Sequence, residues 1–540
     1  MAATTARAGT VKSPTPPMGW NSYNAYACTP TEAIVRANAK AMVDLGLAER
    51  GYAVVTVDCG WNGAGRLDGD DGEEGQGAMF WNETLFPSGG KALGDYIHGL
   101  GLEFGLYSGA GYFQCGSEVI PASLGYEDID AQSFAEWGGD TLKYDNCYAS
   151  SPTEMVDVES PESLSPDRFV KMGEALNATG RDIKYFLCQW GVGENVPEWA
   201  APLGNSWRMS NDIFHNWQSI WRIANQAVPH VKHTTVGAFA DLDMLIVGLG
   251  ALSPAEERFH FGFWSMLKSP LIMGAALADL PSDSLDVMSN EEVIAINQDP
   301  LAKAGQLIMR YTEEEWDIWA GELSGDRKVV GVANWRNESQ TVQVDFGLVG
   351  VSSATTRDPW TAQDGSVSGI EEMNLAPHEL RILVLSDIEE AKLPEETSSY
   401  NSVQDAIISR NASLNECQRG CAPLGQKVID FIGDSMVTFE SVSAPRDGAL
   451  LVGVDFINHE YHFFEALELG TNTRNMSISV NGGESKRWAF PLSGGDWFET
   501  GRLMVELDGF VQGDANSVVF SAPPEGERGP DVVGLQIYDY

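Results

Sequence analysis

The chain has 540 residues, more than a single hydrophobic core usually serves, so two to four domains are expected. A hydrophobic share of 43% and an aromatic share of 10% exclude a wholly disordered protein. The formal net charge of −43 excludes nucleic acid as a partner, because a phosphate backbone would be repelled.

Membrane insertion is not expected either, because no apolar run reaches the roughly 18 residues that cross a bilayer. The N-terminal stretch MAATTARAGTVKSPTPP has no apolar core of the signal-peptide type, so the chain is either cytosolic or begins after a removed signal. Seven cysteines and five Asn-x-Ser/Thr triplets favour a secreted, extracellular glycoprotein. The triplets begin at Asn82, Asn177, Asn337, Asn411 and Asn475. No cysteine pair has zinc-site spacing, so no metal is expected.

Short β-rich runs alternate with amphipathic helical stretches over the first 300 residues. The predicted strands are 52–58, 103–108, 141–145, 184–190 and 269–275, and the predicted helices include 31–47, 130–138 and 253–267. This alternation indicates parallel strands joined by helical crossovers. A (β/α)8 TIM barrel over 1–302 fits this length better than the alternative, an open doubly wound sheet, and no GxGxxG turn follows the first strand.

Polar and aromatic residues collect where these strands end. They are Asp58 with Cys59, Tyr107 with Ser108, Lys143 with Asp145, Gln189 with Trp190, Arg208 with Asp212, and Asp241 with Asp243. Each one taken alone is more often a solvated loop residue. In a barrel, however, the carboxyl ends of the strands meet at one face and carry the function. Acids, amides and aromatic rings together are typical of a sugar site.

The sequence pattern changes after residue 303. Residues 303–387 contain short alternating strands with turn residues between them and predict an antiparallel β-sandwich. The charged, proline-containing composition of segment 388–400 predicts a linker. Residues 401–540 predict a second, C-terminal β-sandwich.

Five stretches over residues 15–385 together resemble glycoside hydrolase family 27, the retaining α-galactosidases and α-N-acetylgalactosaminidases. They are PPMGWNSYNAY, DIDAQSFAEWGGDTLKYDNCY, GNSWRMSNDI, DLDMLIVG and EEVIAINQDPL. The resemblance implies a (β/α)8 barrel followed by an antiparallel β-domain. It also implies hydrolysis of terminal α-D-galactosyl residues by double displacement, without a cofactor or a catalytic metal. The partner would be a galactose-containing oligosaccharide or a plant polysaccharide.

Two carboxylates match the catalytic pair of that family. Asp145 in KYDNC corresponds to the nucleophile and Asp212 in RMSNDI to the general acid/base. Retention needs such a pair about 5–5.5 Å apart. Lys143 and Arg208 match residues that bind sugar hydroxyls, and Lys143 is expected to lower the pKa of Asp145.

Three tryptophans are candidates for the apolar walls, because sugar faces stack on aromatic rings. They are Trp20, Trp61 and Trp190. The alternative for each is a place in the core. The stretch GVGENVPEW after Trp190 looks too bulky for an acetamido group, which favours galactose over N-acetylgalactosamine.

The resemblance also implies disulfides. Cys147 matches a cysteine that pairs with one on the preceding loop, here Cys115, and would brace the nucleophile. Cys28 with Cys59 is the other pair that it implies. Apart from the resemblance, Cys417 and Cys421 are expected to pair across a three-residue gap, which leaves Cys188 free.

Two positions depart from the family pattern. Family members read Asp-Asp-Cys-Trp where this chain reads VDCGW, so either Cys59 faces the sugar in place of an acid or it pairs with Cys28 and an acid is lost. Gln189 stands where a glutamate is common. Both changes keep a β-L-arabinopyranosidase open as an alternative function.

The C-terminal unit, 401–540, weakly resembles family-35-like carbohydrate-binding modules. Such modules often hold a structural calcium, although no ligand set can be picked from the sequence. The alternative is a stabilising β-domain without a ligand. From other functional classes, a non-catalytic carbohydrate-binding protein and an adhesion protein also stand as alternatives.

Overall fold

The computed structural model describes residues 13–69, 72–155, 164–191, 195–417, 420–460, 473–524 and 526–540, apart from the side chain of residue 398. These residues belong to two compact units. The first unit comprises Met1–Asn216 and His233–Lys303, and the second comprises Trp217–Lys232 and Ala304–Tyr540.

A parallel sheet of eight strands forms the centre of the first unit, in the order β7-β6-β5-β4-β3-β2-β1-β8 among the described residues. The strands are Met18–Asn21 (β1), Val54–Thr56 (β2), Glu103–Gly109 (β3), Thr141–Asp145 (β4), Lys184–Cys188 (β5), Ser206–Arg208 (β6), Phe239–Asp241 (β7) and Leu271–Met273 (β8). A parallel bridge between Leu245 and Met273 connects the chain just after β7 to β8. The strands therefore close into a TIM barrel, as expected.

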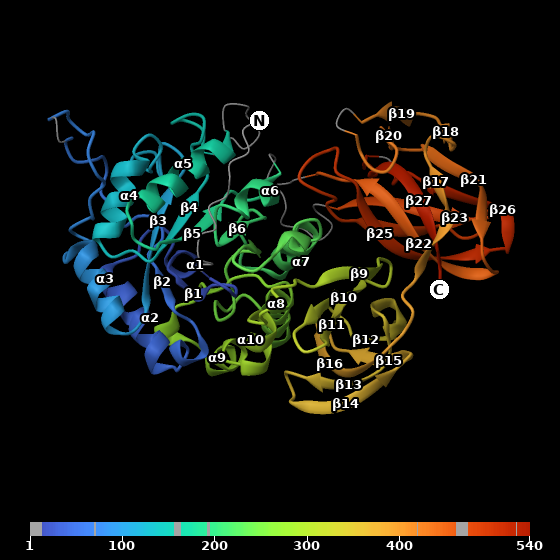
Figure 1. Cartoon of the computed structure of the whole chain (residues 1–540), viewed down its shortest axis with the longest axis horizontal. Helices are drawn as coiled ribbons and strands as arrows, with labels where there is room; N and C mark the ends of the chain where they lie inside the picture. Colours follow the sequence, from blue (N-terminus) through green and yellow to red (C-terminus); the bar gives the residue numbers. More distant parts are fainter. Residues whose placement is uncertain are drawn as a thin grey trace. The chain divides into compact units, whose positions relative to one another are not determined.

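Helices of this unit follow the strands along the chain. They are Tyr23–Tyr26 (α1), Glu32–Asp44 (α2), Gly89–Gly99 (α3), Glu127–Glu136 (α4), Ser165–Ala178 (α5), Val196–Ala200 (α6), Pro254–Met266 (α8), Ser282–Met288 (α9) and Glu291–Asn297 (α10). Figure 1 shows α3 and α4 on the outside of the strands. Short 3-10 turns occupy Ala48–Arg50 and Leu277–Asp279.

Local sequence signals explain where two of these helices begin. The Thr31 side chain accepts a hydrogen bond from the Ile34 N–H at the start of α2. At the start of α8, Ser253 and Glu256 form a reciprocal capping box, with Pro254 at the first helical position. The Thr31 cap fixes the start of α2, and the capping box fixes the start of α8.

The second unit contains two sets of antiparallel strands. The first set is Gln306–Tyr311 (β9), Trp316–Leu323 (β10), Arg327–Asn334 (β11), Gln340–Asp345 (β12), Val351–Asp358 (β13), Gln363–Ser368 (β14), Ile370–Leu375 (β15) and Leu380–Glu390 (β16), with a 3-10 turn at Phe346–Val349. These strands form a six-stranded sheet, β14-β13-β16-β11-β10-β9, and a pair, β12-β15. They form the first β-sandwich that the sequence predicts.

The second set forms the C-terminal β-sandwich. Its strands are Glu395–Ser402 (β17), Ile407–Ser409 (β18), Ser413–Glu416 (β19), Gln426–Ile429 (β20), Met436–Ala444 (β21), Gly448–Ile457 (β22), Arg474–Val480 (β23), Lys486–Phe490 (β24), Gly501–Phe510 (β25), Gly513–Ser521 (β26) and Asp531–Asp539 (β27). One sheet runs β19-β20-β27-β22-β25 with β17 on β27, and the other runs β18-β21-β26-β23-β24. Leu450, Val452, Val454 and Phe456 alternate along β22 into the buried core.

Two expected boundaries differ from the structure. Of the predicted linker 388–400, residues 388–390 belong to β16 and 395–400 to β17, because β17 pairs with β27 across a sequence gap that composition cannot reveal. Helix Trp217–Ala227 (α7) lies within the predicted barrel segment 1–302 but belongs to the second unit. There Trp217 stacks on His378 with ring centroids 4.2 Å apart, and Asn225 accepts a hydrogen bond from Arg310.

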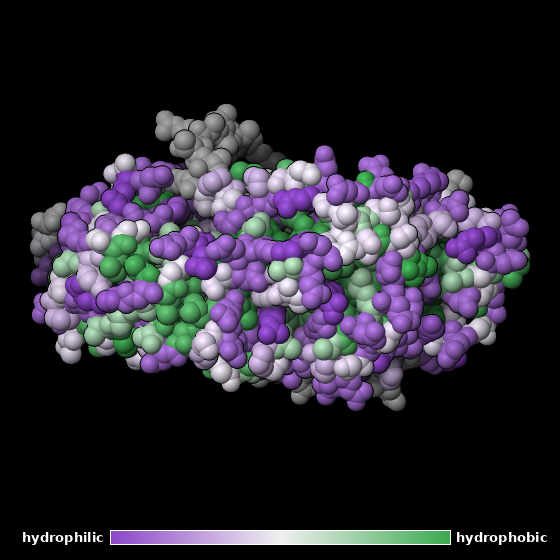
Figure 2. Space-filling model, turned by 90° about the horizontal axis from the view of Figure 1, so that it is seen from below, coloured by the Kyte–Doolittle hydropathy of each residue, from purple (hydrophilic) through white to green (hydrophobic). Residues whose placement is uncertain are grey.

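The surface is largely hydrophilic on the face that Figure 2 shows, with smaller hydrophobic patches between the polar side chains. This agrees with the net charge of −43. Among the described residues, no helix is both long and apolar enough to span a bilayer.

Candidate active site

The polar residues predicted at the strand ends come together at the carboxyl ends of the barrel strands. Strands β3 and β4 place Tyr107 beside Lys143, and β4 and β5 place Asp145 beside Cys188. Strands β6 and β7 place Arg208 beside Asp241. The strands are parallel, so these side chains share one face of the barrel.

Asp145 is held by three hydrogen-bond donors. Its Oδ1 accepts from the Asn146 N–H at 2.9 Å and from the Trp190 indole Nε1 at 3.0 Å, while its Oδ2 accepts from the Tyr107 hydroxyl at 3.0 Å. The residue is only 7% exposed. Trp190 reaches this position with a φ of 78°, in the left-handed region that non-glycine residues seldom adopt. The carboxylate is therefore fixed in orientation before any ligand binds.

The charge state of Asp145 is set by opposing effects. Burial raises the pKa of Asp145 above its ordinary value, Lys143 opposes this rise, and the charge of Asp212 adds to it. Lys143 does act to lower the pKa of Asp145, as expected. The expectation that this pKa lies below its ordinary value is wrong. Desolvation outweighs the effect of Lys143 because the carboxyl is buried.

Lys143 belongs to a buried polar network with the β2 loop. Its Nζ donates to Asp58 Oδ2 at 2.8 Å, and Asn21 Nδ2 donates to the same oxygen at 2.7 Å. Burial acts to lower the pKa of Lys143, but the carboxylates of Asp58 and Asp145 hold it well above its ordinary value. Asp58 thus keeps a cation beside Asp145.

Asp212 has different surroundings from Asp145. Its side chain is 57% exposed, and Arg208 donates to its Oδ1 at 2.7 Å. The Arg208 guanidinium is itself buried and also donates to Ser210 O and to Asp243 Oδ1. One carboxylate of the pair is therefore buried and fixed by several donors, while the other faces solvent.

Asp243 was predicted as a sugar contact, but its oxygens already have partners within the chain. They accept from Arg208 at 2.9 Å and from the Ile213 and Met244 N–H groups at 2.7 Å each. Asp241 in turn accepts from the Asp243 N–H at 2.8 Å. Burial raises the pKa of Asp243 to about 6, against the lowering effect of Arg208. Asp243 therefore acts on the site through Arg208, and a direct contact with the sugar stays a prediction.

Two of the three predicted aromatic walls are fully buried. Trp20 and Trp61 are both 0% exposed. Trp20 donates to Ala275 O, and Trp61 donates to Tyr107 O and packs with its ring 4.6 Å from that of Trp81. Both rings are buried in this structure, so a role in stacking on the sugar stays a prediction for each of them.

Gln189 is also fully buried, with its amide bonded to Ser165 and Gly191. It supports the loop of Trp190, and its contact with the sugar stays a prediction. Residues 192–194 of the stretch GVGENVPEW, on which the argument against an acetamido group depended, lie outside the described residues.

The predicted cysteine pairs are all present. The disulfides are Cys28–Cys59, Cys115–Cys147 and Cys417–Cys421, and Cys188 is a buried free thiol. Burial raises the pKa of Cys188 well above its ordinary value, and its sulfur accepts from Arg208 at 3.6 Å. The second disulfide lies two residues beyond Asp145, as the brace requires.

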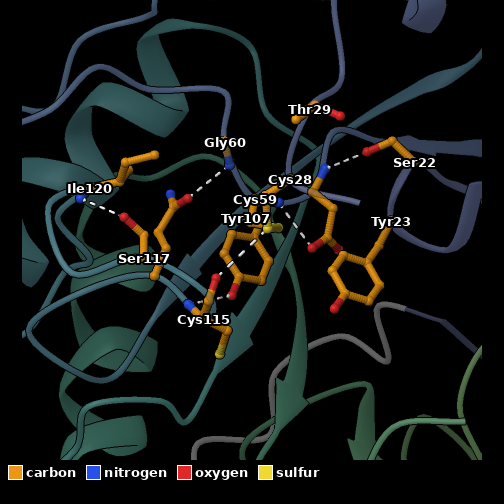
Figure 3. The surroundings of a disulfide bond; sticks show 12 residues. Ser22, Tyr23, Cys28, Thr29, Cys59, Gly60, Tyr107, Cys115, Ser117 and Ile120 are labelled. Carbon is orange, nitrogen blue, oxygen red and sulfur yellow. Dashed lines mark hydrogen bonds between the residues drawn. A yellow bond between two sulfur atoms is a disulfide. The ribbon is translucent and has the colours of Figure 1, made fainter. Parts of the chain in front are cut away.

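The alternative in which Cys59 faces the sugar is excluded by its disulfide with Cys28 (Figure 3). Gly60 follows with a φ of 83°, and a Cβ at this position would lie 2.1 Å from Cys28 O. Its N–H donates to Gln114 at 2.9 Å. The extra glycine of VDCGW therefore lets the loop turn tightly around the disulfide.

Sequence reasoning missed Tyr23, the first residue of α1. Its ring lies 5.7 Å from Lys143 Nζ, and burial, followed by the charge of Asp212, raises the pKa of Tyr23 to about 12. Figure 3 shows Tyr23 and Tyr107 near the Cys28–Cys59 disulfide. The signal was its place directly after the carboxyl end of β1, where the tryptophan of MGWN drew attention instead.

A small cavity of about 40 Å³ lies among these groups. Polar and apolar side chains line it: Asn21, Thr56, Lys143, Phe186, Leu187, Cys188, Arg208, Asp241, Asp243, Met244 and Ile272. Its volume admits one or a few water molecules.

Comparisons with known proteins agree with this geometry. The family model for α-galactosidase A matches residues 15–299, and that for the α-galactosidase C-terminal β-sandwich domain matches 313–385. A probable α-galactosidase D from Aspergillus fumigatus is 37% identical over 97% of this chain and 96% of its own length.

Solved structures give the same result. α-Galactosidase I from Mortierella vinacea aligns with a TM-score of 0.64 and 34% identity over 70% of this chain and 99% of its own. An α-galactosidase from Saccharomyces cerevisiae aligns with a TM-score of 0.63 and 29% identity over 69% and 98%. The barrel, the paired strand-end carboxylates and these matches together show that the chain belongs to the α-galactosidase family, glycoside hydrolase family 27, and is a glycoside hydrolase.

Proposed function

We propose that the protein is a retaining exo-α-galactosidase in which Asp145 is the nucleophile and Asp212 the general acid/base. The observation that carries the proposal is the contrast between the two carboxylates. Asp145 is buried and oriented by three donors, which suits attack on an anomeric carbon. Asp212 is exposed on the open side, where a leaving group departs and water enters.

The proposed reaction has two displacements. Asp145 attacks the anomeric carbon while Asp212 gives its proton to the departing oxygen, which forms a galactosyl ester. Asp212 then takes a proton from water as that water cleaves the ester. Lys143 and Arg208 are proposed to bind sugar hydroxyls, and no step requires a cofactor.

Stereochemistry tests this mechanism directly. Proton NMR of an early reaction mixture should show the α anomer of galactose before mutarotation. The first appearance of the β anomer would mean a single displacement and would overturn the role of Asp145.

Two variants separate the proposed roles. Asp145→Asn should abolish turnover, because an amide cannot form the ester. Asp212→Ala should lower kcat/KM about 10²- to 10⁴-fold for a sugar leaving group and far less for an activated aryl galactoside, which needs little acid assistance. Equal losses on both substrates would contradict the acid role.

The proposed substrates are galactose-containing oligosaccharides and plant polysaccharides. A Saccharomyces cerevisiae α-galactosidase of the same fold has been solved with raffinose, which supports the oligosaccharide. Release of galactose from raffinose and from a galactomannan would decide between the two classes.

A β-L-arabinopyranosidase is the second candidate. Because Cys59 is in a disulfide, VDCGW contributes one carboxylate, Asp58, and its oxygens already accept from Lys143, Asn21 and the Cys59 N–H. A pocket short of one acid favours a galactose hydroxymethyl less strongly. Parallel assays of an aryl α-galactoside and an aryl β-L-arabinopyranoside would measure the preference.

Secretion, and a carbohydrate-binding role with a structural calcium for residues 401–540, are proposals as well. The three disulfides of the described residues favour an oxidising compartment. Asn177, Asn337 and Asn411 are exposed and accessible to glycosylation. A mass decrease after enzymatic deglycosylation of the protein from culture medium would support secretion.

A further inference from the structure

One face of helix α8 bonds the backbone of the loop after β7 at three points. Glu257 Oε1 accepts from the Gly248 N–H at 2.8 Å, and His260 Nε2 accepts from the Ile246 N–H at 3.0 Å. Trp264 Nε1 donates to Asp243 O at 2.8 Å. Positions 257, 260 and 264 follow the three- and four-residue spacing that puts side chains on one helical face.

The loop that α8 holds in this way carries Asp243. This residue has a φ of 83°, in the left-handed region, so its conformation depends on the contacts around it. Its carboxylate receives Arg208 and the Ile213 N–H, and Arg208 donates to Asp212. A continuous set of hydrogen bonds therefore runs from α8 through the β7 loop to both sides of Asp212.

His260 can make its bond only as a neutral ring. The Ile246 N–H can only donate, so Nε2 must accept and the proton must lie on Nδ1. His260 is fully buried, and its Nδ1 has no hydrogen-bond partner within the described residues. Burial lowers the pKa of His260 to about 3, so the acceptor survives at acidic pH.

We propose that His260 and Trp264 are positioning residues for Asp212: through the backbone of residues 243–246 they hold Asp243, which orients Arg208 and the Asp212 loop. Neither side chain touches the groups proposed to react. The inference rests on the proposed acid/base role of Asp212.

Leaving-group dependence tests the proposal, because misplacing the acid harms poor leaving groups selectively. His260→Leu removes the acceptor. It should lower kcat/KM about 10- to 100-fold for raffinose but less than about 3-fold for an aryl α-galactoside with an activated leaving group. His260→Gln, whose Oε1 can accept in place of Nε2, should restore raffinose turnover to within about 3-fold. Trp264→Phe, which loses only the Nε1 donor, should show a smaller loss with the same selectivity.

Phe259→Leu is the matched control, since Phe259 is the buried neighbour of His260 on the same helix. It should lower the melting temperature and leave the ratio of the two kcat/KM values unchanged. If His260→Leu loses both activities equally, or if the Gln variant fails to restore the ratio, the positioning role is overturned. A failure of the proposed acid role would appear separately: Asp212→Ala would then lower kcat/KM equally for raffinose and for the activated aryl galactoside.

Discussion

Three hydrogen-bond donors orient the carboxylate of Asp145 and influence its pKa. Hydrogen bonds to a carboxylate favour its ionised form, whereas burial disfavours it. In this site burial prevails, because the pKa of Asp145 is raised despite Lys143 and the Asn146 N–H. A proposed nucleophile with a raised pKa should lose activity as the pH falls through that pKa, because its oxygen then takes up a proton.

Removing the Tyr107 hydroxyl tests this balance. Tyr107→Phe deletes the donor to Oδ2 at 3.0 Å, so the ionised form of Asp145 loses a charge-assisted hydrogen bond of about 1.5–3 kcal/mol. The pKa of Asp145 should rise further, and the acidic limb of the kcat/KM–pH profile should move to higher pH by one to two units, at about 1.4 kcal/mol per unit.

Tyr144→Phe is the matched control, on the neighbouring strand β4 that also carries Asp145. Tyr144 is buried, and its hydroxyl has no hydrogen-bond partner within the described residues. Its acidic limb should coincide with that of the unmodified enzyme. A profile for Tyr107→Phe that also stays in place would mean that the hydroxyl does not control the charge of Asp145.

Pattern reasoning at this scale identified Asp145, Asp212, Lys143 and Arg208 because charged side chains at strand ends stand out against apolar strands. The same reasoning could not assign Trp20 and Trp61, since an aromatic ring suits both the core and a sugar site. Both side chains are fully buried in the structure.

The loop after β2 depends on one covalent link. Cys28 and Cys59 are 31 residues apart, and their disulfide holds Asp58 in reach of Lys143. Closing a loop of that length restricts the unfolded chain by about 3–4 kcal/mol in the entropic model.

Replacing both cysteines with alanine should therefore lower the free energy of unfolding of the barrel by about 3–4 kcal/mol. The ratio of α-galactoside to β-L-arabinopyranoside turnover should stay constant, because Cys59 does not face the sugar. Urea unfolding followed by tryptophan fluorescence, and the two assays on the folded variant, measure these outcomes.

The Cys417–Cys421 pair provides the comparison, because its loop spans 4 residues. The same model predicts a smaller loss of about 2 kcal/mol when both its cysteines become alanine. A changed substrate ratio in the Cys28/Cys59 variant would show that the disulfide shapes the sugar pocket itself.

At the scale of the whole molecule, the dominant feature is a net charge of −43. Such a charge destabilises the compact state through self-repulsion. Ionised buried carboxyl groups also destabilise the folded state. Burial raises the pKa of Asp243 to about 6, and it also raises the pKa values of Asp130, Asp145 and Asp241.

We expect the melting temperature to be higher at pH 5 than at pH 8. A carboxyl whose folded pKa exceeds the unfolded value of about 3.9 contributes stability below that value and loses it as the pH rises through the folded pKa. For Asp243 the loss falls between about pH 4 and pH 6, because its folded pKa is about 6. Differential scanning calorimetry over this range measures the effect.

Added salt separates the effect of surface charge repulsion from that of the buried carboxyl groups. Added sodium chloride screens surface repulsion but not buried groups. It should raise the melting temperature more at pH 8 than at pH 5 and leave a residual pH dependence. A melting temperature that falls steadily from pH 8 to pH 5 would contradict the assignment of raised pKa values to these carboxyl groups.

The alternation of strands and helices, and hence the barrel, was determined by the sequence alone, because hydrophobic periodicity acts over neighbouring residues. The same holds for the two β-sandwiches and for the order of acids at the strand ends. Only the tertiary structure decided that Asp243 is bonded to Arg208 and Ile213, that Trp61 packs on Trp81, and that 395–400 pairs with β27. Each of these outcomes depends on contacts between residues 20 to more than 100 positions apart, and no local pattern encodes which distant group will occupy a hydrogen-bonding or packing position.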